Sequence, residues 1–262
     1  MPRFTLAASL LLCTVSTVAQ NSPTSDPLAI SLVQQSVTAL NGGAAISDVT
    51  LTGNANWIAG SDNETGQLTL RAKGVAESRI DLNLSGGTRT EIRNDTAGFP
   101  QGESIRPDGS VRAWATHNCW INASWFFPAL SFLSATSDPT LVFSYAGLET
   151  HRQATVQHLR IFRYLAGQKP AYISLTQRIS TVDIYLDATS LLPRAFVSTI
   201  HPDDDALTDI AVEILFSNYK AVNGVQTPLR IQRLVQNGLA VDLVVTGVAL
   251  NSGLPDSLFA VQ

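Results

Sequence analysis

The chain has 262 residues, of which 45% are hydrophobic and 15% are charged, and its formal net charge is −4. This composition excludes an intrinsically disordered chain, because it supplies enough apolar surface to form a core. The acidic balance argues against a nucleic-acid partner, which requires a basic surface. It also argues against adhesion to anionic lipid surfaces by charge alone.

The N-terminal segment has the pattern of a cleavable secretory signal. Arg3 supplies a positive charge, Leu6–Val18 is uncharged and apolar, and the small residue Ala19 follows. The apolar stretch is shorter than the roughly 20 residues that a membrane-spanning helix needs. We therefore expect residues 1–19 to be a signal peptide, followed by a single soluble domain over residues 20–262, in a periplasm or secreted, with no transmembrane segment.

The two cysteines raise two further questions. A lipoprotein signal cleaved before Cys13 is the alternative reading, and Leu12 argues against it because such sites carry Gly, Ala or Ser there. Removal of the signal leaves Cys119 alone, so an internal disulfide is not possible. No His or carboxylate pattern is placed to activate this thiol, and we expect Cys119 to be a small buried hydrophobe.

One helix is predicted directly after a polar leader. Ser25 or Asp26 can cap its start, Pro27 suits its first turn, and Asn41-Gly42-Gly43 suits its end. Apolar residues recur at helical spacing from Ala29 to Leu40, which predicts an amphipathic helix that lies against an apolar surface.

From Val49 onward, apolar residues alternate with polar ones, which predicts an antiparallel meander. The clearest hairpin surrounds Asn237-Gly238, and Asn223-Gly224 marks another turn, because Asn and Gly tolerate positive φ angles. Residues 95–109 are expected to form a loop. The later strands are expected near residues 110–116, 140–146, 154–165, 172–178, 181–187, 194–200, 209–218, 227–236 and 239–250.

An aromatic segment interrupts the strands between Trp120 and Leu133. It is apolar nearly all round, so we expect a short helix that is either an ordinary core helix or the lid of an apolar hollow. Under the second reading, five aromatic residues are candidates to line a ligand cavity or its lid. They are Trp57, Trp125, Phe126, Phe132 and Phe143.

The sequence contains no recognisable catalytic constellation. The histidines His117, His151, His158 and His201 have no metal-site spacing, and there is no Gly-x-Ser-x-Gly elbow and no phosphate-binding loop. The cluster formed by His201 and Asp203–Asp205 could bind Ca²⁺ or contribute to a hydrolase site, but a solvated turn explains it more simply. We expect no enzyme activity, no cofactor and no metal.

Two segments of the last third carry a family resemblance. Ile184-Tyr185-Leu186-Asp187 followed by Leu191-Leu192-Pro193, and Phe216-Ser217-Asn218-Tyr219-Lys220 followed by Val222-Asn223-Gly224-Val225 and Pro228, resemble the LolA-like superfamily of lipoprotein and lipid carriers. The order of elements along the mature chain is similar as well. The resemblance implies a mainly β (α+β) fold, in which a curved antiparallel sheet forms an incomplete β-barrel and helices cover its concave face. It also implies that this concave face holds lipid or lipoprotein acyl chains.

The leading hypothesis is therefore a monomeric, non-catalytic carrier of lipid or lipoprotein acyl chains. A structural or sensing module with a filled core that binds another envelope protein is one alternative. A hydrolase with a spatially assembled site is another. The size of the space between sheet and helices separates these hypotheses.

Overall fold

The computed structural model describes residues 22–95 and 99–262, so the expected signal peptide and Cys13 lie outside the described residues. Within them the chain forms the helices α1 (Pro27–Asn41) and α2 (Pro170–Ser180) and thirteen strands. Four short 3₁₀ helices are η1 (Thr116–Cys119), η2 (Pro128–Leu130), η3 (Phe132–Ser134) and η4 (Asp256–Phe259). No helix in this part of the chain has the length and apolar character needed to cross a membrane.

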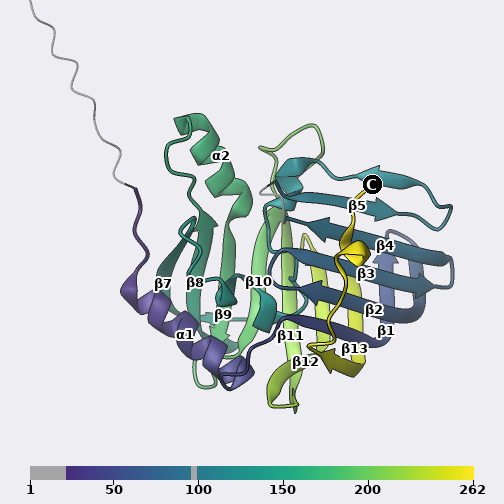
Figure 1. Cartoon of the computed structure of the whole chain (residues 1–262), viewed down its shortest axis with the longest axis horizontal. Helices are drawn as coiled ribbons and strands as arrows, with labels where there is room; N and C mark the ends of the chain where they lie inside the picture. The colour runs from purple at the N-terminus through teal and green to yellow at the C-terminus, as the bar shows by residue number, and fades with distance from the viewer. Residues whose placement is uncertain (1–21, 96–98) are drawn as a thin grey trace, which may run out of the picture.

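All thirteen strands belong to one antiparallel sheet that curls without closing (Figure 1). Its order is β6-β5-β4-β3-β2-β1-β13-β12-β11-β10-β9-β8-β7, so the first and last strands meet in its middle and a meander extends to each side. The strands are β1 (Asp48–Ala59), β2 (Asp62–Lys73), β3 (Glu77–Leu84), β4 (Gly87–Asn94), β5 (Gln101–Ile105), β6 (Val111–Ala113), β7 (Leu141–His151), β8 (Ala154–Arg163), β9 (Val182–Asp187), β10 (Pro193–Ile200), β11 (Ile210–Val222), β12 (Val225–Val235) and β13 (Gly238–Leu250). The predicted incomplete barrel is confirmed.

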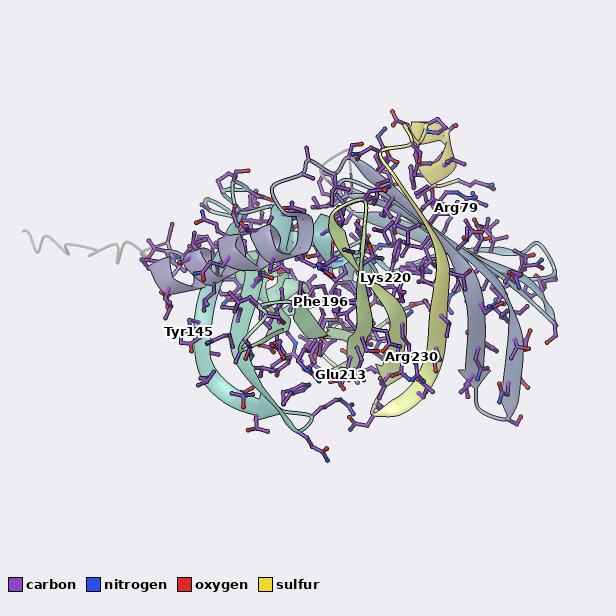
Figure 2. The ribbon with its side chains drawn as sticks, turned by 90° about the horizontal axis from the view of Figure 1, so that it is seen from below. Arg79, Tyr145, Phe196, Glu213, Lys220 and Arg230 are labelled. Carbon is purple, nitrogen blue, oxygen red and sulfur yellow. The ribbon has the colours of Figure 1, made fainter. Side chains whose placement is uncertain are left out.

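Helix α1 covers part of the concave face and carries the predicted caps. The Asp26 side chain accepts a hydrogen bond from Leu28 N at 2.8 Å, and Gly42 ends the helix at φ 59°. The helix packs against β7, β12, η2 and η3, and its buried face joins the main core with Leu32 and Val33. Figure 2 shows α1 along one side of the curl, with Phe196 inside the curve of the sheet.

Two residues ahead of α1 also pair with the backbone of one edge strand of the sheet. Asp26 N donates to the carbonyl of Phe143 in the edge strand β7 at 2.8 Å, and Phe143 N donates to Ser25 Oγ at 3.1 Å. Asp26 therefore begins the helix and pairs with the sheet at the same time.

The C-terminal segment packs on the opposite, convex face. Element η4 contacts β3 and β4, and its Phe259 is fully buried. Gln262 N donates to the buried carboxylate of Glu103 at 2.9 Å, while the next residue of β5, Ser104, points to the concave side. The convex face of β3 to β5 is thus covered by the chain's own end.

Replacing Phe259 with Ala should destabilise the protein by about 3–5 kcal/mol, because a fully buried ring leaves a cavity between η4 and the sheet. Urea unfolding measures this loss. Ser257→Ala, at an exposed position of the same element, is the control and should stay within about 0.5 kcal/mol of wild type. Equal stability of the two variants would contradict the packing.

Four sequence-based expectations about secondary structure are wrong. The segment 172–178 is not a strand but lies in α2, since Pro170 starts a helix whose buried residues Ile173, Thr176 and Ile179 recur every three positions. The expected loop 95–109 contains the paired strand β5, and the expected strand 110–116 is only β6 with a following turn. The aromatic segment is not one short helix but a series of turns with η2 and η3.

Side-chain hydrogen bonds explain why that aromatic segment does not form a regular helix. Ser131 is extended, at φ −82° and ψ −177°, and separates η2 from η3. Its hydroxyl donates to the Pro128 carbonyl at 2.7 Å and accepts from Leu133 N at 3.3 Å. The hydroxyl takes the place of a backbone partner, which is how Ser interrupts helices.

The two predicted hairpins are present, with one shift of position. Val222 pairs with Val225, so Asn223 and Gly224 form the turn, at φ 51° and 83°. In the last hairpin Val235 pairs with Gly238, and the turn is formed one residue earlier than expected, by Gln236 and Asn237 at φ 48° and 66°. The preference of Asn-Gly for positive φ predicted the hairpin but not its register.

Polar contacts hold the tip of the β7–β8 hairpin against β9 and β11. His151 stacks on Tyr185, with ring centroids 3.9 Å apart, and its Nε2 donates to Glu213 Oε1 at 2.7 Å. Arg152 Nε donates to the same carboxylate at 2.8 Å. His158 also stacks on Tyr185. Burial alone would raise the pKa of Glu213, but the hydrogen bonds from Arg152 and His151 outweigh it and hold this pKa below its ordinary value.

Because folding lowers its pKa, Glu213 stabilises the fold above the ordinary Glu pKa of about 4.3 and loses that contribution as the pH falls through its folded-state pKa. Glu213→Gln should therefore cost about 1–2 kcal/mol at neutral pH. The difference from wild type should shrink between about pH 5 and pH 3. Urea unfolding across this range measures the difference. Asp62→Asn, at an exposed carboxylate in β2, is the control and should show no such pH dependence. A difference that does not change with pH would contradict the assignment.

Candidate functional site

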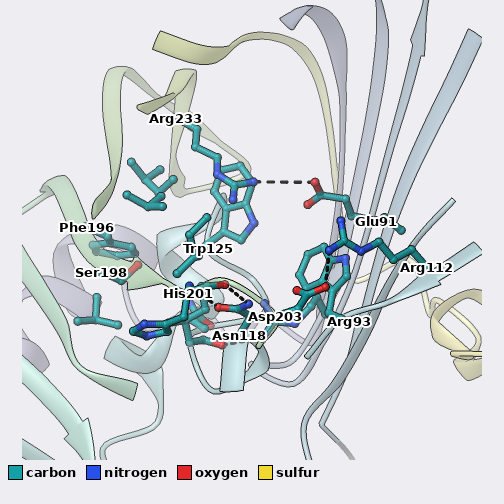
Figure 3. A pocket seen from close by; sticks show the side chains of 18 residues that line it. Glu91, Arg93, Arg112, Asn118, Trp125, Phe196, Ser198, His201, Asp203 and Arg233 are labelled. Atoms are coloured by element: carbon teal, nitrogen blue, oxygen red, sulfur yellow. Dashed lines mark hydrogen bonds and ion pairs between the residues drawn. The ribbon is translucent and has the colours of Figure 1, made fainter. Parts of the chain in front are cut away.

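A cavity of about 240 Å³ lies inside the curl of the sheet, between the strands β4 to β6 on one side and β9 to β12 on the other (Figure 3). The segment from Trp114 to Trp125, which follows β6 in the chain, lines the cavity between these two walls. Its two walls differ in chemistry. The lining residues are Glu91, Arg93, Ser104, Arg112, Trp114, Asn118, Ile121, Asn122, Trp125, Val182, Phe196, Ser198, Ile200, His201, Asp203, Val212, Ile214 and Arg233.

The wall formed by β9 to β11 is apolar. Phe196 in β10 and Val212 and Ile214 in β11 point inward at alternate positions, as the period of a strand requires. Each is buried, and Phe196 packs edge-on against Phe216 with ring centroids 4.9 Å apart. These side chains can contact an apolar chain without loss of hydration of a polar group, and Ser198 in β10 is the polar residue of this wall.

The opposite wall is charged, because β4 turns its charged residues inward. Glu91 and Arg93 line the cavity, and Arg89 of the same strand lines a neighbouring one. The alternate residue Ile92 is also buried, but on the convex face, where η4 packs against β4. The cover supplied by η4 thus allows the charged face of β4 to be the concave one.

Arg93 is a buried cation in this wall. It is 5% exposed, and its guanidinium donates to the carbonyls of Cys119 and Ile121, the latter at 2.9 Å. Burial lowers the pKa of the Arg93 guanidinium. It forms no ion pair with a carboxylate of the described residues, although Arg112 pairs with Asp203 beside it.

A smaller cavity of about 130 Å³ adjoins the first. Glu91, Trp125 and Arg233 line both, so these three side chains separate them. Arg233 lies 3.9 Å from Glu91 in an ion pair across the curl, and its guanidinium carbon is 5.8 Å from the Trp125 ring centroid.

One side of the larger cavity is closed by the loop after β10, which docks onto η1 (Figure 3). The Asn118 side chain forms two hydrogen bonds with the backbone of His201. Asn118 Nδ2 donates to the His201 carbonyl, and the His201 N–H donates to Asn118 Oδ1, both at 2.8 Å. His117 Nε2 donates to the carbonyl of Pro202 at 2.9 Å, and Arg112 pairs with Asp203. These contacts join the end strand β6 to the distant strand β10.

The His201 cluster does not have the arrangement of a hydrolase site. Thr199 Oγ1 is 3.4 Å from His201 Nε2, and Asp209 Oδ1 is 3.5 Å from Nδ1, which places a hydroxyl, an imidazole and a carboxylate in order. However, Nδ1 donates to the nearer Thr208 carbonyl at 3.0 Å. The His201 side chain has no exposed surface, and the cavity is lined by the neighbours of Thr199, not by Thr199 itself. Among the described residues, no group of three His, Cys, Asp or Glu side chains is arranged to hold a metal.

The structure distributes the five predicted ligand-binding aromatics between the cavities and the core. Trp125 lines both cavities, and Trp57 lines the smaller one under Arg89, whose guanidinium carbon is 4.0 Å from its ring centroid. Phe126, Phe132 and Phe143 are at most 4% exposed and belong to the packed core. Contact of any of the five with a ligand stays a prediction.

Sequence reasoning missed the charged lining and found the buried cysteine. The alternation in Thr88–Arg93 predicts a strand, but it favours Ile92, not Arg93, as the inward residue. The apolar residues around Phe259 near the C-terminus need a surface to pack against, and this need could have indicated that Ile92 faces them instead of the cavity. Cys119 is 2% exposed and burial raises the pKa of its thiol, which agrees with the expected inert role.

Replacing Asn118 with Ala should loosen the loop after β10, because it removes both hydrogen bonds to the His201 backbone. We expect a loss of about 1–3 kcal/mol in stability and faster amide hydrogen exchange in residues 201–209 than in the wild type, with exchange in β11 unchanged. Hydrogen-exchange mass spectrometry measures the second effect. Asn63→Ala, at an exposed position of β2 with an ordinary φ angle, is the matched control and should leave exchange in the loop unchanged. Unchanged exchange in the loop would contradict the role of Asn118.

Comparison with known proteins identifies the fold. No protein-family model matches the sequence, and no curated protein matches it. The structure resembles a putative outer membrane lipoprotein-sorting protein domain from Vibrio parahaemolyticus, with a TM-score of 0.56 and 12% identity over 88% of this chain and 96% of that one. It also resembles a LolA superfamily protein from Nitrosomonas europaea, with a TM-score of 0.55 and 11% identity over 88% and 97% of the two chains.

A third structure has the same architecture. It is a DUF1329 family protein from Desulfovibrio piger, with a TM-score of 0.55 and 12% identity over 89% of this chain and 96% of that one. The chain therefore has the fold of the LolA superfamily along nearly its whole described length, as the resemblance in its last third implies. At these identities the likeness concerns fold alone.

Proposed function

We propose that the protein is a non-catalytic periplasmic or secreted carrier that holds the acyl chain of a lipid or lipoprotein inside the curl of its sheet. The observation that supports this most is the cavity of about 240 Å³ with an apolar wall. Burial of a chain against Phe196, Val212 and Ile214 would contribute about 25 cal/mol per Å² of apolar area removed from water. The smaller adjoining cavity extends the space available.

The chain's fold and leader fit the same proposal. One structural relative is described as a lipoprotein-sorting protein domain, and the expected signal peptide would export the chain. Trp125 is placed to contact an acyl chain in either cavity, with Trp57 in the smaller one. The buried, backbone-bonded His201 offers no support for the hydrolase alternative. The filled-core alternative requires a space of only a few tens of Å³, smaller than the space present.

Native mass spectrometry of the protein purified from its host, followed by titration with myristic (tetradecanoic) acid, tests the proposal. Ser198→Trp places an indole on the wall of the larger cavity and should weaken binding by about tenfold or more, equivalent to at least about 1.4 kcal/mol. Ser217→Trp, at an exposed position of β11, is the matched control and should bind as wild type does. A wild-type protein that carries no lipid and binds no acyl probe would refute the carrier function.

A further inference from the structure

The residues that line the larger cavity include one more arginine than carboxylates. Three arginines line the cavity, Arg93, Arg112 and Arg233, against the two carboxylates Glu91 and Asp203. Arg112 pairs with Asp203 and Arg233 with Glu91. Arg93 is left with two backbone carbonyls and, within the described part of the chain, no carboxylate partner.

A buried charge without a counter-charge is costly, because its hydration is lost and not replaced. Arg93 is 5% exposed, and burial is the main cause of its lowered pKa; Glu91 and Asp95 favour the charged form, but from beyond ion-pair distance. The Trp114 ring, with its centroid 5.4 Å from the guanidinium carbon, compensates only in part. A ligand that brings a negative charge into the cavity would supply the counter-charge that Arg93 lacks.

A second lining residue has an unused hydrogen-bond donor. Asn122 is 5% exposed, and its Oδ1 accepts from Ser124 N at 3.3 Å. Its Nδ2 is buried and has no hydrogen-bond partner. A buried amide without a partner costs about 1–3 kcal/mol. Asn122 follows Ile121, whose carbonyl accepts a hydrogen bond from Arg93, so the unpaired amide and the buried guanidinium lie at the same end of the cavity.

From these two observations we propose that the cavity takes a single-chain amphiphile with an anionic head group. The head group accepts hydrogen bonds from Arg93 and Asn122 at the charged wall, and the chain lies against Phe196, Val212 and Ile214. Figure 3 shows Arg93 and Phe196 on opposite sides of the cavity. A carboxylate and a phosphate share this chemistry, since both are acceptor-only anions. This inference rests on the proposed carrier function and adds the class of ligand.

Titration calorimetry of the wild-type protein with four probes of equal chain length tests the head group. The probes are tetradecanoate, tetradecyl phosphate, tetradecanol and tetradecyltrimethylammonium. The two anions should bind about tenfold or more tightly than the alcohol, because charge-assisted hydrogen bonds exceed neutral ones. The ammonium should bind most weakly, and the tighter of the two anions shows whether the cavity fits a carboxylate or a phosphate better.

Asn122→Asp places a negative charge beside the proposed head group. It should weaken tetradecanoate binding about tenfold or more while changing tetradecanol binding less than about threefold. Ser104→Asp adds a carboxylate to the same wall from β5 and should act in the same direction, which guards against misfolding of the first variant. Asn83→Asp makes the same change at an exposed position of β3 outside the cavity and should leave both affinities unchanged.

The outcomes separate this inference from the carrier function. Equal affinity of the wild type for tetradecanoate and tetradecanol, or equal loss of both in Asn122→Asp and Ser104→Asp, would overturn the anionic head group and leave acyl binding intact. Absence of binding by all four probes would overturn both.

Discussion

The structure depends on one constraint: a thirteen-stranded sheet that curls without closing has two faces to cover with a single chain. The chain meets this with elements placed at its ends and in the middle. Helix α1 and the aromatic segment fill the concave side of one half, and η4 covers the convex side of the other. Where the convex face is covered, the concave face need not be apolar. In β4 the apolar residue packs under η4 on the convex side, and the charged residues line the cavity on the concave side.

Cover of a strand on both faces limits what can be predicted from the sequence. Alternation identifies β4 as a strand, but it cannot say which face of a strand is concave when both faces are covered. Ile92 is buried as its type suggests, yet it is Glu91 and Arg93 that line the cavity. The choice depends on η4, more than 150 residues away in the chain, and no local pattern encodes such a contact.

Local signals predicted local features well. Asp26, Pro27 and Gly42 define α1 because capping acts over one turn of the chain. The segment around Ile173 was misassigned because two short periodicities overlap within it, and Pro170 was the stronger cue. The curved sheet itself was foreseen from the LolA-like resemblance. The distribution of the aromatics was not foreseen, since Trp125 and Phe126 are adjacent in sequence and only the first lines a cavity.

An unclosed sheet also has two free edges, and unpaired edge strands can template association between molecules. Strand β6 is only three residues long, which leaves little edge to pair. Strand β7 is longer, and Ser25 and Asp26 occupy its backbone at Phe143. These two residues lie a few positions after the expected export signal. Cleavage at the expected site near Ala19 would keep both residues on the mature chain, where they shorten the length of β7 backbone that is free to pair with a second copy.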